Sequence, residues 1–505
     1  MTVARPGPQP ALARERERAV LAAVPVGLFI DGTWRPATGG GVFAVEDPAT
    51  GDELREVADA TPEDALAALA AASGAAGGWR RTAPRERADL LRRVYELLIE
   101  RRSDLALLMT CEMGKPLAES VSEVDYAAGF LRWYSEEAVR INGRFAESGA
   151  GGGRVITMRQ AVGPCLFVTP WNFPLAMGAR KVAPALAAGC TCVVKPAAQT
   201  PLTMLAFADL LHEAGVPAGV VNIVTGSEAA SLVSPLLADP RLRKISFTGS
   251  TGVGKQLVRA SAEQLLRVSM ELGGNAPFLV FADADLDTAV DGAVTAKMRN
   301  GGEACTAANR FLVHASVADE FADRLATRLG DLVIGRGTES GVQLGPLIDA
   351  RQRDAVAELV DDAVRHGARL LCGGRPMARP GYFYPATVLT DVRPGTRILD
   401  EEIFGPVAPV VPFSTDAEAV AAANESSYGL AAYLYTRDID RAFEVAGELD
   451  TGMVAVNQGT VSDVSAPFGG IKQSGFGREG GPEGIDEYLE IKYLALKVGS
   501  TGNSS

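Results

Sequence analysis

The chain has 505 residues, of which 47% are hydrophobic and 22% are charged. A single hydrophobic core seldom organises a chain of this length, so we expect more than one globular domain. The formal net charge of −13 argues against nucleic acid or a membrane surface as a partner, because both polyanions repel an acidic protein that has no concentrated basic patch.

The sequence also argues against a membrane-spanning or secreted protein. The first apolar stretch, residues 19–30, contains Pro25 and is shorter than the roughly 20 apolar residues that a bilayer requires. No cleavage site typical of a secretory signal follows it. The six cysteines are scattered over a large chain, which favours reduced thiols over a disulfide framework. We therefore expect a cytoplasmic protein.

The first part of the chain is predicted to contain a flexible arm, short strands and then long helices. Residues 1–18 form the predicted flexible arm. Between residues 28 and 60, alternating apolar residues interrupted by turn sequences indicate short strands. Residues 62–144 change to the periodicity of amphipathic helices, with Thr61 and Ser103 as predicted N-caps.

Two α/β domains and a small β arm are predicted for the rest of the chain. Apolar, β-branched runs that alternate with helical segments are typical of a parallel, doubly wound sheet. We assign residues 19–148 and 164–275 to the first domain and 276–460 to the second. The glycine-rich segment and alternating strand at 149–163, together with the tail at 485–505, are predicted to form an arm that contacts a partner subunit.

Two glycine-rich sequences are candidates for a phosphate-binding turn. The literal G-x-G-x-x-G pattern at 475–480 does not follow a convincing strand of a βαβ unit, so we interpret it as coincidental. The better candidate contains Gly249 and Ser250, which follow a predicted strand and precede a predicted helix at 253–261. Glycines there would let the backbone approach a pyrophosphate at a helix N-terminus. An ordinary turn without a ligand has the same local pattern.

Cys305 and Glu271 are the candidate reactive groups. Cys305 closely follows two glycines, a setting that favours an open turn or a helix N-terminus, where a thiolate is stabilised. Glu271 follows an apolar strand and precedes paired glycines, which suits a general base. Taken alone, each residue also fits an ordinary role, as a buried cysteine or a solvated glutamate. The three histidines lack a supporting motif, and no G-x-S-x-G sequence is present.

Seven motifs occur in an order that resembles the aldehyde dehydrogenase superfamily, and the resemblance covers residues 25–495. The motifs are Thr169-Pro-Trp-Asn-Phe-Pro174, Val194-Lys-Pro-Ala197, Phe247-Thr-Gly-Ser250, Glu271-Leu-Gly-Gly-Asn275, Gly302-Glu-Ala-Cys305, Glu401-Glu-Ile-Phe-Gly-Pro406 and Pro467-Phe-Gly-Gly-Ile-Lys-Gln-Ser-Gly475. A chance match of seven ordered motifs is negligible. The resemblance implies an α/β fold of two doubly wound domains, a dinucleotide-binding one and a catalytic one that contains Cys305, with a small β oligomerisation arm.

The resemblance implies an aldehyde oxidation that passes through a cysteine thioester. Cys305 would attack the aldehyde carbon, and the resulting oxyanion would be held by the side-chain amide of Asn172 and the backbone N–H of Cys305. One such donor typically contributes about 3–4 kcal/mol. After hydride transfer to a nicotinamide, Glu271 would activate the water that hydrolyses the thioester. The presence of Glu271 distinguishes this pattern from the branch that transfers the acyl group to coenzyme A.

The resemblance also implies the residues that bind NADP or NAD. Lys195 would hold the adenosine ribose and Glu402 the nicotinamide ribose. The other predicted cofactor contacts are Trp171, Pro196, Ala197, Ala198, Gly249, Ser250, Leu272 and Phe404. Many NAD-preferring relatives carry a glutamate at the position of Ala198, where it repels a 2′-phosphate, so NADP is admitted beside NAD. No metal site is expected.

Two further positions depart from the family pattern. Glu303 stands where a glutamine is common, two residues before Cys305. Because an inward carboxylate would raise the pKa of the thiol, we expect Glu303 to point away. Ala307 stands where some semialdehyde enzymes have a second cysteine, so the sequence lacks a disulfide switch at that spacing.

Within the superfamily, the sequence is most similar to the succinate-semialdehyde dehydrogenases. Arg180, Arg299 and Ser462 match the carboxylate clamp of that group. Two guanidinium groups and a hydroxyl suit a short carboxylate that must bind to an acidic protein. Phe173 and Phe468 are expected to line the same substrate site. The alternative for the two arginines is a structural ion pair.

Three other interpretations are open at this point. Glutarate semialdehyde is longer than succinate semialdehyde by one methylene, which changes affinity by only about 1–3 kcal/mol. A cysteine esterase would use the thioester half of the same mechanism, and a binding or structural protein would use neither half. The resemblance further implies a homodimer or homotetramer that assembles through the arm and the tail.

Overall fold

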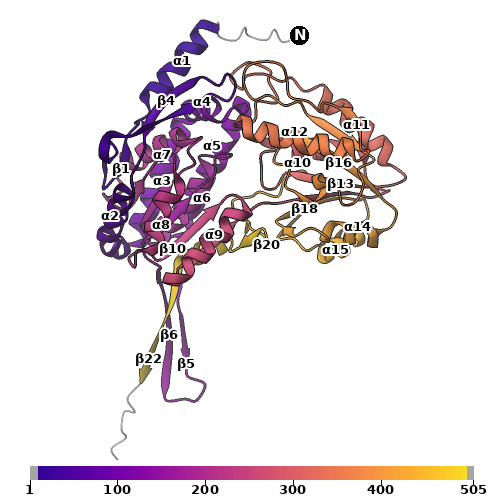
Figure 1. Ribbon diagram of the computed structural model, residues 1–505. Helices are drawn as coiled ribbons and strands as arrows, with labels where there is room; N and C mark the ends of the chain where they lie inside the picture. Colours follow the sequence, from indigo (N-terminus) through magenta and orange to yellow (C-terminus); the bar gives the residue numbers. More distant parts are fainter. Residues whose placement is uncertain (1–9, 498–505) are drawn as a thin grey trace, which may run out of the picture.

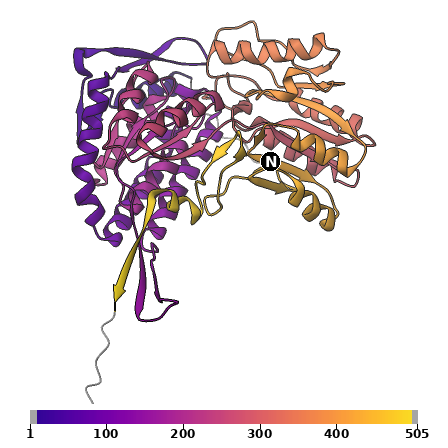
Figure 2. The same cartoon turned by 60° about the horizontal axis from the view of Figure 1, so that its bottom comes forward.

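The computed structural model describes residues 10–497, which form two α/β bodies and a thin arm (Figure 1). The first body, coloured indigo to magenta, contains an eight-stranded sheet, and the second, mostly orange, contains a seven-stranded sheet. The arm projects away from both bodies, as the view turned by 60° also shows (Figure 2). Among residues 10–497, no helix is both long enough and apolar enough to span a membrane.

The first body packs helices on both faces of its sheet. Its strands are β1 Leu28–Ile30, β2 Thr33–Arg35, β7 Cys165–Val168, β8 Cys192–Lys195, β9 Val221–Ile223, β10 Lys244–Thr248, β11 Arg267–Glu271 and β21 Gly475–Phe476. Its helices are α1 Pro10–Ala23, α2 Pro62–Arg81, α3 Pro84–Glu100, α4 Arg102–Met113, α5 Leu117–Glu137, α6 Ala176–Ala188, α7 Pro201–Glu213, α8 Ala229–Ala238 and α9 Thr251–Ser261. A hairpin of β3 Val42–Glu46 and β4 Glu53–Ala58, with the short helices η1 Thr38–Gly40 and η2 Ala262–Gln264, completes it.

Alternation along the central strands places two apolar clusters on opposite faces of this sheet. In β7, Cys165 and Phe167 belong to the cluster that contains α3 to α7, whereas Leu166 and Val168 belong to the cluster of α2 and α8. Successive side chains of a strand point to opposite faces, so a continuous apolar run fits a sheet that is covered on both sides. The sheet is therefore a rigid layer inside the body.

The strand order of the first sheet reverses beside β7. The order is β2-β1-β9-β8-β7-β10-β11-β21, so the chain moves from β7 toward β9 on one side and through β10 and β11 on the other. In such sheets, ligands bind beyond the carboxyl ends of the strands at the point of reversal. Trp171 follows β7, Gly249 follows β10 and Leu272 follows β11 at this edge. The fold therefore directs several predicted site residues to one crevice.

The second body presents the amino ends of its strands to that crevice. Its strands are β12 Ala276–Val280, β13 Ala308–His314, β14 Arg369–Cys372, β15 Thr387–Thr390, β16 Val407–Phe413, β18 Ala431–Tyr435 and β19 Met453–Val456, in the order β14-β15-β16-β13-β12-β18-β19. Its helices are α10 Leu286–Met298, η3 Arg299–Gly302, α11 Ala318–Gly330, α12 Ala350–Arg365, α13 Arg397–Asp400, α14 Asp416–Asn424 and α15 Ile439–Glu448. Cys305 precedes β13 and Glu402 precedes β16, so the second body contributes both residues from one edge of its sheet.

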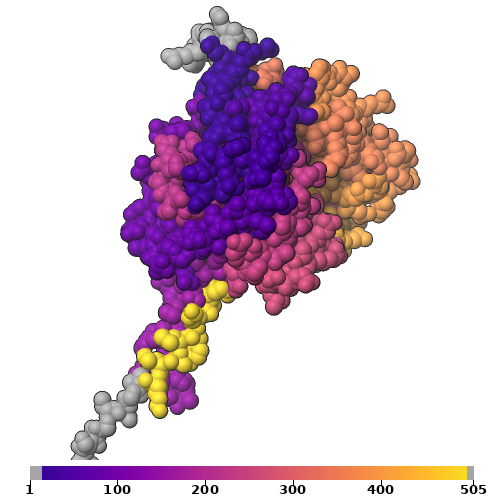
Figure 3. Space-filling model, turned by 60° about the vertical axis from the view of Figure 1, so that its left-hand side comes forward, coloured from indigo at the N-terminus to yellow at the C-terminus, as the bar shows by residue number. Residues whose placement is uncertain are grey.

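The arm consists of three antiparallel strands. These are β5 Arg144–Glu147, β6 Gly153–Ala161 and β22 Leu489–Lys497, and the helix η4 Glu483–Tyr488 leads into the last of them. In the space-filling view, the yellow β22 lies along the purple strands of a narrow projection (Figure 3). The arm begins at Arg144, before the predicted start at residue 149, because the glycine-rich segment is the hairpin turn between β5 and β6 and not a hinge. A short pair of β17 Tyr428–Gly429 and β20 Ile471–Lys472 lies outside the main sheets.

The prediction of a flexible arm over residues 1–18 is wrong for residues 10–18. These residues belong to α1, while residues 1–9 lie outside the described residues. Glu17 of α1 accepts a hydrogen bond from Arg336 at 2.7 Å, and Arg336 also binds the carboxylate of Asp47. Because both acids are buried, this contact attaches the N-terminal helix to the second body.

One of the two predicted N-caps is correct. The Thr61 hydroxyl accepts from the backbone N–H of Asp64, and the Asp64 carboxylate accepts from the backbone N–H of Thr61, which is a capping box. Ser103 is not a cap, because α4 already begins at Arg102 with Arg101 in the cap position. Helix α3 ends at Glu100, so a single residue separates the two helices. The chain therefore has no extended residue before α4 at which a serine side chain could act as the N-cap.

Candidate active site

A cavity of about 360 Å³ lies between the carboxyl edge of the first sheet and the amino edge of the second. It is lined by residues of both bodies. The predicted residues that line it are Trp171, Asn172, Phe173, Arg180, Gly249, Ser250, Glu271, Leu272, Arg299, Cys305, Glu402, Phe404, Ser462 and Phe468. The structure therefore brings together every predicted catalytic and substrate residue. Four predicted cofactor residues, 195–198, lie apart from this cavity at the carboxyl end of β8.

Cys305 lies in a tight turn between η3 and β13. Of the two settings expected for this cysteine, a turn is present, and the element that follows it is strand β13 and not a helix. A side chain at Gly302 would meet the carbonyl oxygen of Gly405 at 2.2 Å, and one at Gly274 would meet the carbonyl oxygen of Cys305 at 2.2 Å. Two glycines are therefore needed to let the backbone approach this turn.

The two reactive groups of the cavity differ in exposure, since Glu271 is buried and Cys305 is partly buried. Burial raises the pKa of Cys305 to about 12, with Arg180 acting in the opposite direction and Glu271 adding to the increase. Burial and the nearby Glu479 raise the pKa of Glu271 well above its usual value. Both carboxyl oxygens of Glu271 are buried without a hydrogen-bond partner among the described residues. Without bound ligands, these surroundings therefore favour the neutral forms of the thiol and the carboxyl.

Two hydrogen bonds fix the side-chain amide of Asn172, and three more hold the backbone around it. Its Nδ2 donates to the carbonyl of Glu303 at 2.9 Å, and its Oδ1 accepts from the backbone N–H of Phe173 at 3.1 Å. The backbone carbonyl of Asn172 accepts from Lys115 Nζ at 2.7 Å and from Asn300 Nδ2 at 3.0 Å, and Asn300 Nδ2 also donates to the Glu303 carbonyl. An amide nitrogen carries two hydrogens, so one N–H of Asn172 is left for the cavity.

Glu303 points away from the cavity, as the sequence predicts. Its carboxylate accepts from the backbone N–H of Ile348 at 3.1 Å, and it is absent from the cavity lining. Burial raises its pKa well above the ordinary value. The acid two residues before Cys305 therefore has a structural contact of its own.

One part of the cavity has the features of a dinucleotide site. Ser250 caps α9, which begins at Thr251, so a helix N-terminus faces the crevice and suits a phosphate group. The rings of Trp171 and Phe404 meet edge to face with centroids 5.4 Å apart. The backbone carbonyl of Phe404 is held by Gln352 Nε2 at 2.8 Å.

Of the two charged residues predicted to hold the ribose groups, Lys195 is buried and Glu402 is partly buried. Glu402 accepts from the backbone N–H of Gly274 at 2.9 Å, and burial raises its pKa to about 7. Burial lowers the pKa of Lys195 to about 8, with Asp59 opposing the decrease. A carboxylate and an amine both hydrogen-bond to hydroxyls, so Glu402 at the cavity and Lys195 at the carboxyl end of β8 suit two separate ribose groups. The residues present therefore fit a nicotinamide dinucleotide.

The two arginines of the predicted carboxylate clamp differ in their partners. Arg180 is fully buried and its Nε lies 2.5 Å from Oε2 of Glu479, so the structural ion pair considered for it is present although it lines the cavity. Arg299 forms no ion pair within the described part of the chain, and its Nη1 lies 3.4 Å from the Ser462 hydroxyl. Its guanidinium also lies 4.9 Å from the centroid of the Phe173 ring. Arg299 is thus the available cation.

The comparisons with known proteins agree with this geometry. A family model described as the aldehyde dehydrogenase family matches residues 34–494. This chain belongs to that family. A solved structure of a succinate-semialdehyde dehydrogenase from Burkholderia pseudomallei matches this aldehyde dehydrogenase with a TM-score of 0.93 and 47% identity, and the match covers 94% of this chain and 99% of the other. The predicted fold class is confirmed.

Relatives of this aldehyde dehydrogenase have names that refer to acid semialdehydes. It is 57% identical to a succinate-semialdehyde dehydrogenase of Paenarthrobacter nicotinovorans, over 88% of this chain and 98% of the relative. It is 48% identical to an NADP(+) succinate-semialdehyde dehydrogenase of Escherichia coli strain K12 and to a glutarate-semialdehyde dehydrogenase of Pseudomonas aeruginosa, in both cases over 93% of this chain and 97% of the relative.

The sequence motifs of this aldehyde dehydrogenase do not indicate three residues that shape the cavity. Glu479 lies within the G-x-G-x-x-G sequence, which has no place in a βαβ unit here, since β21 pairs antiparallel with β11 at the edge of the sheet. Lys115 lies between two helices, and Tyr126 lies in the middle of α5. Of the three, only Lys115 has a local sequence signal: Gly114-Lys115-Pro116 indicates a break between two helices.

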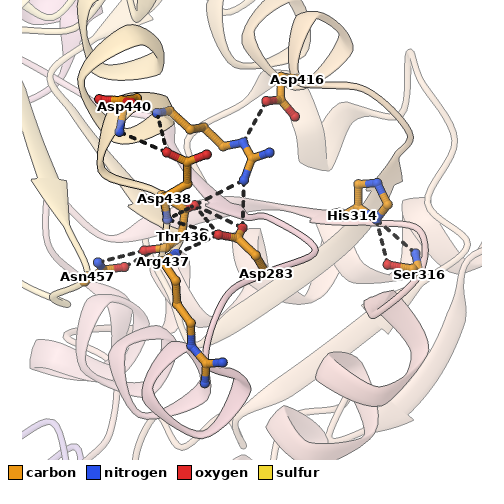
Figure 4. A network of polar contacts seen from close by, with 10 residues as sticks. Asp283, His314, Ser316, Asp416, Thr436, Arg437, Asp438, Asp440 and Asn457 are labelled. Atoms are coloured by element: carbon orange, nitrogen blue, oxygen red, sulfur yellow. Dashed lines mark hydrogen bonds and ion pairs between the residues drawn. The ribbon is translucent and has the colours of Figure 1, made fainter.

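Several polar groups outside the cavity of this aldehyde dehydrogenase form a hydrogen-bonded network. Figure 4 shows such a network at the carboxyl ends of β12 and β18. There Asp283 accepts from the Thr436 hydroxyl at 2.8 Å, from the backbone N–H of Arg437 at 2.9 Å and from Arg441 at 2.9 Å. No His, Cys, Asp or Glu cluster among residues 10–497 could hold a metal ion. The three histidines, His212, His314 and His366, are absent from the cavity lining.

The raised pKa of Cys305 predicts how its alkylation depends on pH. Without cofactor, the fraction of thiolate is small at pH 7, and it increases about ten-fold per pH unit up to the pKa. We expect the rate of Cys305 carbamidomethylation by iodoacetamide, followed by mass spectrometry of its peptide, to increase throughout pH 7 to 10. A plateau below pH 9 would contradict a buried, protonated thiol. Labelling of Cys372 in the same samples controls for unfolding.

Proposed function

We propose that this aldehyde dehydrogenase oxidises succinate semialdehyde to succinate with NADP or NAD, in the cytoplasm. The observation that carries the proposal is that one cavity contains the Cys305 thiol, the Asn172 amide and the Glu271 carboxyl together with Arg299. Within residues 10–497, Arg299 has no carboxylate partner in an ion pair. An aldehyde with a terminal carboxylate supplies both the carbon that the thiol attacks and the anion that the guanidinium binds. The names of the relatives support this substrate.

The first step forms a bond between Cys305 and the substrate. The Cys305 sulfur, after loss of its proton, attacks the aldehyde carbon, and the electron pair of the C=O bond moves to oxygen. The free N–H of Asn172 and the backbone N–H of Cys305 donate to this oxyanion. The product of the step is a thiohemiacetal, and Arg299 keeps its carboxylate end away from the thiol.

The second half converts the thiohemiacetal to the acid. The bound nicotinamide supplies the hydride acceptor. Loss of hydride from the carbon restores C=O and leaves a thioester on Cys305. Glu271 removes a proton from water, the resulting hydroxide attacks the thioester carbon, and the C–S bond breaks to release succinate and the Cys305 thiolate. Glu271 must first lose its own proton, so we expect hydrolysis to become faster as the pH increases.

The cofactor assignment includes both nicotinamide dinucleotides. Ala198 is partly exposed near the end of β8, where it has no carboxylate to repel a 2′-phosphate. The relative from Escherichia coli is named for NADP(+). The predicted cofactor contacts favour a redox enzyme over a cysteine esterase, because an esterase needs no dinucleotide. These contacts are Lys195, Glu402, Trp171 and Phe404. Reduced cofactor, detected by its absorbance at about 340 nm, separates these two activities.

Glutarate semialdehyde is the second candidate substrate. The relative with that name is as similar to this chain as the relative named for succinate semialdehyde in Escherichia coli, at 48% identity. The same cation and hydroxyl can bind either carboxylate, since one methylene changes affinity by only about 1–3 kcal/mol. Initial rates with both semialdehydes and both cofactors decide between them.

Removal of Arg299 is expected to lower activity selectively. In Arg299→Ala, kcat/KM with succinate semialdehyde should fall, because the substrate carboxylate loses its cation. The decrease should correspond to a loss of about 2–4 kcal/mol in transition-state stabilisation. With uncharged butanal, the loss of transition-state stabilisation should be less than about 1 kcal/mol. Equal losses with both aldehydes would refute the carboxylate clamp. The exposed Arg328→Ala is the control. Arg180→Ala is a poorer test, because it also removes a buried partner of Glu479.

Replacement of Glu271 is expected to stop the cycle after the oxidation. In Glu271→Gln, mixing enzyme with aldehyde and cofactor should give a burst of reduced cofactor of about one equivalent per active site, followed by slow turnover. Stopped-flow absorbance measures the burst. A variant that turns over as fast as the wild type would remove Glu271 from thioester hydrolysis. Glu358→Gln, at another wall of the cavity, should keep full turnover.

The arm is proposed to join subunits into a homodimer or homotetramer. It carries exposed apolar side chains, among them Phe145, Ile491 and Tyr493, which are 68%, 70% and 62% exposed. Exposed apolar side chains on a projecting β-ribbon favour contact with another subunit. Deletion of residues 489–505 should give a monomer in light scattering, whereas deletion of 498–505 should leave the assembly intact. A monomeric wild-type protein would contradict this assembly.

A further inference from the structure

Tyr126 presents an unsatisfied hydroxyl at the active-site cavity. The residue lies in the middle of α5 and lines the cavity with Arg180, Arg299 and Ser462. Its hydroxyl oxygen is buried and has no hydrogen-bond partner among residues 10–497. Buried polar groups are hydrogen-bonded in the great majority of cases, so an unpartnered hydroxyl at a cavity wall indicates a partner that the cavity itself receives.

Neighbouring rings fix the position of this hydroxyl. The Tyr126 ring meets the Phe130 ring edge to face, with centroids 4.8 Å apart, and Phe130 is fully buried. The Arg299 guanidinium lies 5.9 Å from the Tyr126 centroid and 4.9 Å from the Phe173 centroid. The phenol is therefore held beside the available cation, and its O–H can turn only about its own C–O bond.

The charges around the site favour an anion as the missing partner. Glu479 neutralises Arg180 through an ion pair, whereas the Arg299 side chain has only the Ser462 hydroxyl within hydrogen-bond distance in the described part of the chain. A carboxylate has two oxygens and about four acceptor positions, more than one guanidinium and one hydroxyl satisfy. A phenol O–H is a third donor of the required kind. An unpartnered donor next to an unpaired cation suits a carboxylate better than a cationic or an apolar group.

We infer that Tyr126 is a specificity-determining residue whose hydroxyl donates a hydrogen bond to the terminal carboxylate of the bound semialdehyde. This inference rests on the proposed function, because it names a further contact of the same substrate. Tyr126 acts at the carboxylate end, away from the thiol, so it stabilises the bound substrate and the transition state alike. The loss of such a contact increases KM and leaves kcat nearly unchanged.

The test uses Tyr126→Phe, which removes one oxygen atom and keeps the ring. For succinate semialdehyde we expect KM to increase about ten-fold with kcat within about two-fold, as expected for the loss of a hydrogen bond to a charged group. For butanal, which has the same chain length but no carboxylate, both constants should stay within about two-fold of wild type. The inhibition constant of succinate should also increase about ten-fold, because the product binds through the same carboxylate.

A matched control is Tyr435→Phe. The Tyr435 hydroxyl is likewise buried without a partner among the described residues, but Tyr435 is absent from the cavity lining. This variant should keep the wild-type constants with both aldehydes. Melting temperatures of the variants and the wild type show whether each phenylalanine is accommodated.

Each outcome has a distinct meaning. A selective loss with succinate semialdehyde and with succinate supports the inference. Equal losses with both aldehydes, or no loss with either, would overturn it, since Tyr126 would then act only through packing. A wild-type enzyme with no preference for the semialdehyde over butanal would instead overturn the proposed function, and the inference would fall with it.

Discussion

The active site depends on close approach at the junction of the two sheets. β11 ends at Glu271 and β12 begins at Ala276, so four residues connect the bodies. A side chain at Gly273 would meet a Glu402 oxygen at 2.5 Å, and one at Gly274 would meet the Cys305 carbonyl at 2.2 Å. Because both positions lack a side chain, Glu402 and Cys305 can pack against the same short connection. The distance between the two bodies is thereby set where the chemistry occurs.

Burial at this junction sets the state of the reactive groups. The same desolvation that raises the pKa of Cys305 also raises that of Glu271, so it opposes the charged form of both groups. Glu479 contributes to this balance, since it pairs with Arg180 and Lys181 and thereby reduces the positive charge near the thiol. A cavity of this kind favours ligands that bring their own charges, such as a cationic nicotinamide ring and a carboxylate.

Sequence reasoning succeeded where a residue has a local signal. Asn172, Glu271 and Cys305 follow strands or glycines in short motifs, and all three line one cavity. It failed where the signal is long-range. Glu479 pairs with Lys181, 298 residues away in the sequence, and no nearby pattern indicates this contact. Residues 10–18 carry mixed charges, which fit a flexible arm as well as the helix that Arg336 holds in place through Glu17.

The composition of the first sheet affects the order in which the molecule can fold during synthesis. The second sheet uses one uninterrupted stretch, from Ala276 to Val456, and can form as soon as that stretch leaves the ribosome. The first sheet receives its edge strand β21 and the buried acid Glu479 only after the second is complete. Until then Arg180 and Lys181 lack the carboxylate with which they form ion pairs. The nascent chain therefore passes through a state with an unfinished first body, which is where chaperone binding is most useful.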